Sequence, residues 1–444
     1  MHYIARIFVL LTVAIAMAAE AGDFAGGDGS QGSPWQIATP EHLDNVRYHL
    51  NDHFELINDI DLSGTIYSQG SGWVPIGSCG YSAGGNCSEF GFTGFLDGNT
   101  HTIHGLYIDR ERAEVGLFGS LQSGAVVTDL NLSGVNISVG GDDNHYVGAL
   151  AAVAVESEIF NVSVDGVVTG FSHAGGLIGQ MTGGFGQDLH ADVIVSGQDN
   201  AGGLIGVIND GAFPDEALIN RTSASGDVGG RLSVGGLVGS TFLGSVITRS
   251  SAYGNVSSTS HQAGGLVGAM LTDSEARFVF AAGEVESLHN GAGGLVGWLN
   301  RSDLSDCYAT GDVRADNSAG GLVGVQDVGS VLNCYSVGEV GSFGEDGNGI
   351  GGLIGGRSGG SVENSFWDTD ASGMDVSAGG TGVTTSAMLD TETFTDVGWD
   401  FDDVPVWTSG LAGEGDSCPM LTDLPEDPPP CDVIFSASFS VPAG

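Results

Sequence analysis

The chain lacks lysine altogether, and its 11 basic residues are all arginine. Against 55 Asp and Glu residues this leaves a formal net charge of −44. Proteins hold nucleic acid largely by neutralising its phosphates with basic side chains, so we expect no nucleic-acid partner. Attraction to an anionic membrane surface is disfavoured for the same reason. So acidic a surface fits solubility in salt-rich surroundings, where ions screen the repulsion between carboxylates.

Long hydrophobic runs are also missing, except at the N-terminus. Residues 7–17 are apolar, follow Arg6 and precede several small residues. The run is too short to span a bilayer. A basic start, an apolar centre and a small-residue cleavage site are typical of a secretory signal. The sequence therefore predicts a signal peptide over residues 1–21, no direct membrane insertion, and a secreted or cell-surface protein.

Cysteine is scarce, with six residues, and exported proteins usually pair their cysteines. The candidate disulfides are Cys79–Cys87, Cys418–Cys431 and Cys307–Cys334. The first two would close local loops. The members of the third pair stand at the same position of neighbouring repeats, which permits either a disulfide or two stacked buried thiols. No metal site with Cys or His ligands, such as zinc, is expected, because neither loop pair has a partner Cys pair and the 11 His residues show no ligand spacing.

Glycine, in contrast, is abundant, with 77 residues concentrated in a recurring hexapeptide. Residues 292–297 read AGGLVG, and exact or degenerate copies recur every 27–33 residues. Their leucines, which mark the register of the repeat, are Leu117, Leu150, Leu177, Leu204, Leu237, Leu266, Leu295, Leu322 and Leu353. A fixed period of this size is typical of a solenoid.

Each repeat unit contains three short strand-like segments, the hexapeptide being the first, which suits one rung of an all-β parallel β-helix. We expect about nine to eleven rungs. A second stacked column is predicted at Leu130, Val162, Val193, Thr222, Ser250, Val279, Cys307 and Cys334. The paired glycines would permit a positive-φ turn and close packing of successive rungs. Phosphate binding is disfavoured, because a strand follows the glycines where a phosphate loop requires a helix.

Short helical caps are expected at both open ends. Thr39, Pro40 and Glu41 favour the start of a helix at the N-terminal end. Residues 384–394 predict a second helix at the C-terminal end. The predicted organisation is a signal peptide (1–21), an N-terminal cap with the first rungs (22–114), the repeats (115–382), a C-terminal cap (383–423) and a Pro-rich linker and tail (424–444).

The repeated GGL[VI]G followed by NCYSxGxV resembles the GLUG-repeat family of exported bacterial surface proteins. The flanking segments PWQIATPEHL and SFWDTDASG extend the resemblance over roughly residues 27–421. The resemblance implies a right-handed parallel β-helix and a place among adhesin-like surface proteins. It brings no catalytic or cofactor-binding residues.

A polysaccharide lyase or hydrolase is the alternative to a non-catalytic surface protein. Such an enzyme would need three or more carboxylates converging in a groove on one sheet. The acidic pairs in the sequence, at residues 142–143, 345–346 and 402–403, fall instead in loops or caps. Arg221 and Arg249 could share a face, although solvated arginines that balance acidic neighbours explain them better. We therefore expect no catalytic residues.

Ligand-binding signals are few. A sugar-binding stripe would stack aromatic residues rung upon rung, whereas the six Trp residues are dispersed and only Trp298 directly follows a hexapeptide. Acidic turns at residues 140–144 and 344–349 offer oxygen ligands for calcium, without the nonapeptide of calcium-binding β-rolls. The expected function is surface display, adhesion or matrix interaction by a monomer, with an unknown protein or polysaccharide ligand. Segments that differ between rungs, such as residues 183–188 and 209–216, are where the sequence places such a function.

Overall fold

The computed structural model describes residues 23–78, 90–111, 113–140, 146–209, 217–344, 347–401, 406–408 and 418–425. The predicted signal peptide and the tail beyond residue 425 lie outside these ranges. Cys79, Cys87 and Cys431 also lie outside them. Cys418 is described, is completely buried and is disulfide-bonded.

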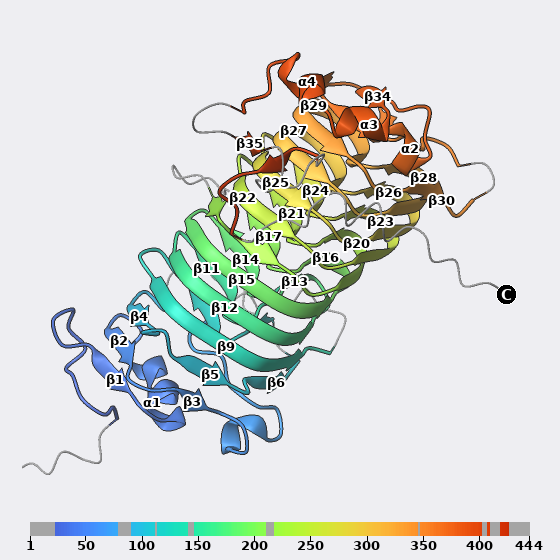
Figure 1. Ribbon diagram of the computed structural model, residues 1–444. Helices are drawn as coiled ribbons and strands as arrows, with labels where there is room; N and C mark the ends of the chain where they lie inside the picture. Colours follow the sequence, from blue (N-terminus) through green and yellow to red (C-terminus); the bar gives the residue numbers. More distant parts are fainter. Residues whose placement is uncertain are drawn as a thin grey trace, which may run out of the picture.

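The described chain coils into a parallel β-helix of about nine turns, as the repeat period predicts (Figure 1). A complete rung is formed by β23 (Val256–Gly264), β24 (Val267–Leu271) and β25 (Glu275–Ala281). Each strand pairs in parallel with its counterpart one rung later, for example Val256 with Val285 and Val267 with Val296. The rungs stack into three sheets that run along the rod.

The strands of the three sheets are bounded as follows. The first, which we call the variable sheet, contains β20 (Val228–Gly235), β23, β26 (Val285–Gly293), β28 (Val313–Gly320) and β30 (Val340–Ser342), preceded by β7 (Glu114–Val115), β10 (Tyr146–Val147), β13 (His173–Gly175) and β16 (Asp199–Gly202). The second contains β8 (Phe118–Leu121), β11 (Ala151–Val155), β14 (Ile178–Thr182), β17 (Ile205–Asn209), β21 (Val238–Phe242), β24, the first part of β27 (Val296–Ala309), the first part of β29 (Val323–Ser336) and β31 (Ile354–Arg357). The third contains β9 (Val126–Ser138), β12 (Glu158–Thr169), β15 (Phe185–Ser196), β18 (Leu218–Asn220), β19 (Ser223–Ala224), β22 (Val246–Ala252), β25, the rest of β27 and β29, β32 (Ser361–Glu363) and β33 (Phe366–Asp368).

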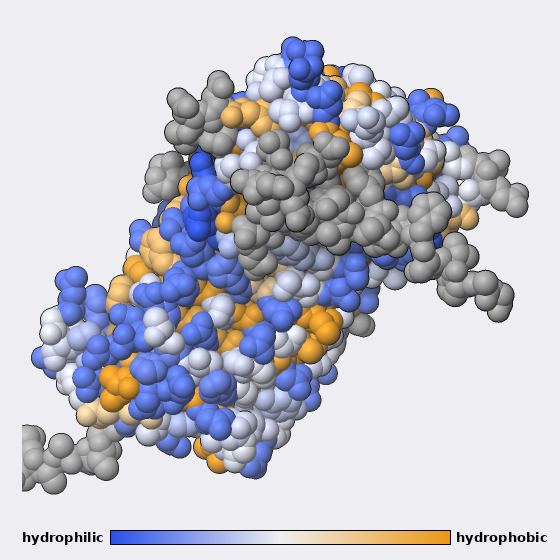
Figure 2. All heavy atoms as spheres, viewed as in Figure 1, coloured by the Kyte–Doolittle hydropathy of each residue, from blue (hydrophilic) through white to orange (hydrophobic). Residues whose placement is uncertain are grey.

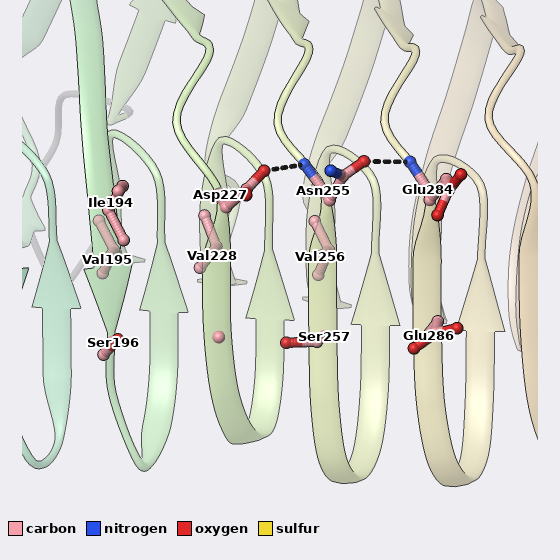
Figure 3. A pocket seen from close by; sticks show the side chains of 11 residues that line it. Ile194, Val195, Ser196, Asp227, Val228, Asn255, Val256, Ser257, Glu284 and Glu286 are labelled. Carbon is pink, nitrogen blue, oxygen red and sulfur yellow. Dashed lines mark hydrogen bonds between the residues drawn. The ribbon is translucent and has the colours of Figure 1, made fainter.

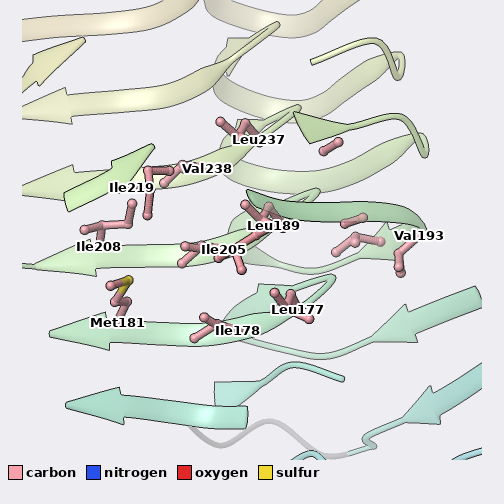
Figure 4. Close-up of a cluster of buried hydrophobic side chains, with 14 of the residues drawn as sticks. Leu177, Ile178, Met181, Leu189, Val193, Ile205, Ile208, Ile219, Leu237 and Val238 are labelled. Atoms are coloured by element: carbon pink, nitrogen blue, oxygen red, sulfur yellow. The ribbon is translucent and has the colours of Figure 1, made fainter. Parts of the chain in front are cut away.

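The hexapeptide forms the corner between the variable and second sheets, and is not the single strand expected from the sequence. In the copy at residues 292–297, Ala292 and Gly293 end β26, Gly294 and Leu295 form the bend, and Val296 begins β27. The leucine side chain points into the core, and all nine repeat leucines have no exposed surface. The close-up in Figure 4 shows two of these leucines, Leu177 and Leu237, together with Ile178 and other buried aliphatic side chains.

The leucine backbones also connect the rungs directly. From Leu150 to Leu322, each leucine N–H donates to the carbonyl oxygen of the next repeat leucine at 2.9 Å. This continuous chain of hydrogen bonds satisfies polar groups that would otherwise be buried unpaired at the corner. The corner therefore carries both an apolar column and a hydrogen-bonded column.

The glycines of the hexapeptide serve close packing, whereas the predicted positive-φ turn lies elsewhere. A Cβ atom on Gly264 would lie 2.0 Å from the carbonyl oxygen of Val267, and one on Gly265 would lie 2.0 Å from that of Gly294. None of the paired glycines has a positive φ. From the copy at residues 201–206 onward, the left-handed residue is the one just before the hexapeptide, such as Gln262 with φ 65°. Close approach of backbones therefore explains the glycines here.

The predicted second column is largely observed, with one wrong member. Val162 pairs with Leu130 on one side and with Leu189 on the other, so Leu189 and not Val193 belongs to the column. Val193 lies opposite Gly166. At the far end of the column, Cys307 and Cys334 pair across β27 and β29 and form a disulfide with a Cα–Cα distance of 4.6 Å.

Both ends of the rod carry short helices. At the N-terminal end, the hydroxyl of Thr39 accepts a hydrogen bond from the His42 N–H at the start of α1 (Pro40–Asn45). The nearby elements are η1 (Val46–Tyr48), η2 (Ile66–Ser68), β1 (Trp35–Ile37), β2 (His53–Leu56), β3 (Ile60–Asp61), β4 (Phe95–Asp97), β5 (Thr102–His104) and β6 (Tyr107–Asp109). At the other end lie α2 (Thr369–Ser372), β34 (Thr381–Val383), α3 (Thr385–Met388), α4 (Glu392–Thr395) and the antiparallel pair β35 (Trp407–Thr408) and β36 (Met420–Leu421). The predicted helix over 384–394 is therefore divided into α3 and α4.

A column of aromatic side chains on the third sheet attaches the C-terminal cap. Phe280, Tyr308 and Tyr335 stack on neighbouring rungs with ring centroids 5.0 Å apart, and all three are buried. Trp399 and Trp407 of the cap cover the two tyrosines. The sequence argument considered the dispersed tryptophans alone and so did not predict this column of Phe and Tyr side chains. The column serves packing, since the cap covers it.

The two stacked tyrosines provide a matched pair for a stability test. The Tyr335 hydroxyl donates to the Pro419 carbonyl at 2.6 Å, whereas the buried Tyr308 hydroxyl has no hydrogen-bond partner among the described residues. We expect Tyr335→Phe to lower the free energy of unfolding by about 1–2 kcal/mol, because it leaves a buried carbonyl unpaired. Tyr308→Phe should be neutral or stabilising by up to about 1 kcal/mol, because it removes an unpaired buried hydroxyl. Urea denaturation of both variants measures the difference, and equal losses would contradict it.

Candidate functional site

The variable sheet combines a constant buried pattern with exposed positions that differ from rung to rung. Its strands begin with a buried column of Val228, Val256, Val285, Val313 and Val340. The residues that follow them, one per rung, are Gly229, Ser257, Glu286, Arg314 and Gly341. The buried valine column fixes the register. The residues that follow the valines can therefore differ in chemistry from rung to rung without disturbing the stack.

Buried serines hold the outward bend of these strands. The Ser258 hydroxyl donates to the carbonyl oxygen of Arg231 on the preceding rung at 2.8 Å and to that of His261 on its own strand at 3.2 Å. Ser287 repeats the arrangement one rung later, with the carbonyl oxygens of Ser260 and Asn290. Both serines are at most 2% exposed. The residues that follow each serine therefore project from the sheet in a fixed conformation.

A polar hollow of about 210 Å³ lies where the strands of the variable sheet begin (Figure 3). Asp227 accepts a hydrogen bond from the backbone N–H of Asn255 at 2.9 Å, and the Asn255 side chain accepts one from the Glu284 N–H at 3.0 Å. Figure 3 shows these three side chains in a row at the turn, with Glu286 further along its strand. The row is thus a set of turn contacts that also lines a surface rich in hydrogen-bond acceptors.

Three carboxylates, those of Asp227, Glu284 and Glu286, line this one hollow. Asp227 and Glu284 stand in the turns that lead into the variable sheet, and Glu286 stands on its strand β26. The acidic pairs considered from the sequence do not contribute to this hollow. The residues 142–143, 345–346 and 402–403 lie outside the described ranges, as do the carboxylates of both calcium-candidate turns. Within the described ranges, no group of three or more His, Cys, Asp or Glu side chains is placed to hold a metal ion.

Arg221 and Arg249 do share a face, on neighbouring rungs of the third sheet. Arg221 pairs with Asp188 at 3.0 Å, and both arginines pair with Asp423 of the C-terminal segment, at 2.7 and 3.2 Å. The hydrogen bond that Arg221 donates to Asp188 is the main cause of the raised pKa of Arg221. The two arginines therefore hold the C-terminal segment against the rod.

A second hollow, of about 300 Å³, lies at the opposite ends of β23 and β26. We call it the Trp298 corner, and it is lined by His261, Gln262, Asn290, Gly291, Trp298, Val325 and Asp327. Trp298 stands on the second sheet between Ala269 of the preceding rung and Val325 of the next. The imidazole of His261 is exposed, whereas the indole of Trp298 is partly buried.

The hollow exists because one corner residue has no side chain. From the copy at residues 201–206 onward, the left-handed position before the hexapeptide is occupied by Asn200, Ser233, Gln262, Gly291, Ser318 and Gly349 in successive rungs. Where a side chain is present, it fills the corner: the Gln262 amide oxygen, for example, accepts a hydrogen bond from Ser233 at 2.6 Å. Within 3.5 Å, a Cβ atom on Gly291 would contact only one atom, the carbonyl oxygen of Gly297, at 3.3 Å. Gly291 therefore leaves open the space beside the indole.

The indole of Trp298 is held in one orientation. Its Nε1–H donates to the Oδ2 atom of Asp327 at 2.7 Å. The Oδ1 atom of the same carboxylate accepts a hydrogen bond from the Ser358 hydroxyl at 2.9 Å. Contacts from two further rungs thus fix the ring, and a fixed side chain loses less conformational entropy on binding a ligand.

The sequence singled out Trp298 but gave no reason to place a site there. The opening at Gly291 could have been found by comparing HQAGGLVGA (residues 261–269) with HNGAGGLVGW (residues 289–298), where the corner glutamine becomes glycine as tryptophan appears. Of the variable segments favoured instead, residues 210–216 lie outside the described part. Gly183 and Gly184 form a turn with positive φ, and Asp188 is paired with Arg221.

Three carboxylates line the polar hollow, whereas the Trp298 corner has one, that of Asp327. On the face shown in Figure 2, hydrophilic side chains alternate with small hydrophobic areas along the rod. In the part of the chain that the structure covers, no helix is long and apolar enough to cross a membrane.

Comparisons with known proteins agree with the repeat pattern. The model of the GLUG motif matches residues 289–314, which include Asn290, Gly291 and Trp298 of the Trp298 corner. A putative Gly-rich membrane protein of Evansella cellulosilytica is 37% identical over 143 residues, which are 31% of this chain and 16% of that protein. Halomucin of Haloquadratum walsbyi is 38% identical over 160 residues, which are 34% of this chain and 2% of that protein.

Among solved structures, a putative immunoglobulin A1 protease from Bacteroides ovatus matches over 90% of this chain and 96% of its own, with 15% identity and a TM-score of 0.39. A match this distant adds nothing to the functional argument. The chain spans only a small part of the two sequence relatives, so their whole-protein activities do not transfer. The repeats, the fold and the motif match together show that this chain carries the GLUG motif at residues 289–314, as the resemblance in its sequence indicated.

Proposed function

We propose that this chain works at the cell surface or outside the cell, as a β-helical rod for adhesion, matrix interaction or surface display, and that it is not an enzyme. The GLUG motif, the β-helix and the kind of relatives it matches support a surface protein. The buried disulfide supports folding in an oxidising compartment, as expected after export.

The variable sheet is the observation that carries the proposal. Five parallel strands in register present a face whose buried side chains repeat and whose exposed side chains do not. In a rod built this way, substitution of the outward-facing residues changes which ligand is bound, while the stacking of the rungs is preserved. Extended surfaces of this kind are what solenoid proteins use for binding partners.

An adhesion assay tests the proposal. Purified protein, coated on a plate, is expected to retain cells or matrix polysaccharide, and the double variant Glu286→Ser, Arg314→Ser should retain markedly less. Both side chains are exposed on the variable sheet, so the fold should survive the change. Glu158→Ser, at an exposed position on the third sheet, is the matched control. Equal retention by all three proteins, with unchanged circular dichroism, would count against adhesion through this sheet.

A polysaccharide-active enzyme is the second candidate, favoured by the three carboxylates in the polar hollow. Release of reducing or unsaturated ends from acidic polysaccharides, abolished by Glu286→Gln, would establish it. If none of the acidic polysaccharides tested releases reducing or unsaturated ends, the non-catalytic proposal stands.

A further inference from the structure

We propose that the Trp298 corner binds one sugar ring of a neutral polysaccharide. This inference rests on the proposed adhesive function and names the chemical class of its ligand. It is carried by three features of the corner: a fixed indole, an opening beside it, and polar side chains around the opening.

The fixed indole offers a surface suited to a sugar. The faces of an aromatic ring carry partial negative charge, and the C–H groups on one face of a pyranose carry partial positive charge. The two therefore pack face to face, provided that the indole does not rotate. Asp327 and Ser358 prevent that rotation through the hydrogen bonds at 2.7 and 2.9 Å. Asp327 is thus a positioning residue, because it acts through Trp298.

The opening beside the indole has the size of a small-ligand site. Its volume, about 300 Å³, is at the lower end of the range usual for ligand pockets. Gly291 creates this space, since the corner residues Asn200, Ser233 and Gln262 on the three preceding rungs all carry a side chain. The space therefore accepts one ring, while the rest of a chain would extend over the exposed strands of the variable sheet.

Polar groups around the opening match the hydroxyls of a sugar. The Gln262 amide oxygen is occupied by Ser233, which leaves its amide nitrogen as a donor. The side chain of Asn290 is exposed and makes no hydrogen bond within the described part of the chain. The exposed imidazole of His261 adds a ring nitrogen that donates or accepts. A hydroxyl both donates and accepts, so it can pair with any of these groups.

The charges of the site favour a neutral sugar over an acidic one. The lining contains one carboxylate, that of Asp327, and no arginine. Asp316, the ion-pair partner of His289 at 3.8 Å, stands on the next strand of the variable sheet. With a formal net charge of −44, the protein repels uronate and sulfate groups at long range.

Glucose, mannose and xylose hexasaccharides with β-1,4 linkages are suitable probes, and polygalacturonate is the acidic comparator. Binding is measured by calorimetry and by the fluorescence of the full chain. We expect at least one neutral probe to bind, and polygalacturonate not to bind. Trp298→Ala should weaken that binding about tenfold or more. Trp298→Phe should retain part of it, since a smaller aromatic face remains.

Gly291→Asn is the sharper variant, since it fills the opening and leaves the tryptophan in place. Asparagine tolerates the left-handed conformation and already occupies this corner position at Asn200. We expect a similar loss of about tenfold. Gly349→Asn makes the same change two rungs away, at a glycine with φ 70° outside the hollow, and should stay within about twofold of the wild type.

The outcomes separate this inference from the function on which it rests. Failure of the folded wild type to bind any neutral probe would overturn the inference, as would full affinity in Trp298→Ala or in Gly291→Asn, or an equal loss in Gly349→Asn. If the adhesion assay remains positive in those cases, the ligand assignment fails and adhesion stands. If adhesion is also absent, the proposed function itself fails.

Discussion

Replacing Gly264 by alanine is expected to lower the free energy of unfolding by more than about 4 kcal/mol, the range of mutations that break a specific structural requirement. The added Cβ atom would lie 2.0 Å from the carbonyl oxygen of Val267 and 2.7 Å from the backbone nitrogen of Gly297. One atom belongs to the same rung and the other to the next, and both are backbone. Relief would therefore require two rungs to separate at the corner.

Gly229→Ala is the matched control for this prediction. It makes the same chemical change one rung earlier, where a Cβ atom would meet only the Ser257 hydroxyl, at 3.4 Å. Neither Gly229 nor Gly264 has a positive φ, so backbone strain does not distinguish them. Gly229→Ala should change the free energy of unfolding by less than about 1 kcal/mol, which denaturant unfolding followed by circular dichroism measures. Equal effects of the two substitutions would refute the packing explanation of the hexapeptide.

The architecture was predictable because the core of a solenoid repeats. Each rung buries the same positions against the rung before, so one period in the sequence specifies register, inward leucine and stacking. The same argument placed Cys307 above Cys334. The exchange of Val193 for Leu189 in the second column has a local cause. On the preceding rung a glycine, Gly166, stands four residues after the column member, but Val193 occupies that position on β15 and the next glycine is Gly197. A register taken from the glycine is therefore four residues too late on this rung.

The origin of the positive-φ turns was less accessible, because the sequence at those positions varies. The corner residues Asn200, Ser233, Gln262 and Ser318 share a conformation, but they comprise three side-chain types. Two adjacent glycines predict a positive-φ turn, since glycine adopts positive φ at the lowest free-energy cost. In this fold the backbones approach each other so closely at the glycines that missing Cβ atoms matter more than φ.

The Trp298 corner could not be inferred from the tryptophan alone. Its side chain meets Asp327 and Ser358 from two later rungs, and the opening depends on what Gly291 lacks. Such a site is defined by a departure from the repeat, whereas pattern reading finds what recurs. The aromatic column under the cap was not predicted for the opposite reason. Its residues Phe280, Tyr308 and Tyr335 do recur, but the cap residues that pack on the column lie about 70–100 residues further along the chain.

Trp407→Ala is expected to release the C-terminal cap from the rod and to cost about 3–5 kcal/mol of local stability, as for other large core aromatics. The indole is completely buried, with its ring centroid 4.4 Å from that of Trp399 and 6.1 Å from those of Tyr308 and Tyr335. Its Nε1–H also donates to Asp306 at 3.4 Å. Burial raises the pKa of this carboxyl, against the opposing effect of hydrogen bonds from Asn333 and Trp407. Loss of the indole therefore removes packing on one side of the column and a partner of a half-buried carboxylate.

Because a solenoid unfolds rung by rung, the expected result is an early transition of the cap before the rod melts. Near-UV circular dichroism and limited proteolysis with subtilisin measure it, since the cap contains the tightly packed aromatic rings. Trp298→Ala is the control, because it removes the same side chain from a partly buried surface position and should cost less than about 2 kcal/mol. A single cooperative transition at the wild-type temperature in Trp407→Ala would show that the cap does not depend on this contact. An early transition in Trp407→Ala alone would identify the aromatic column as the structure that closes the open end of the rod.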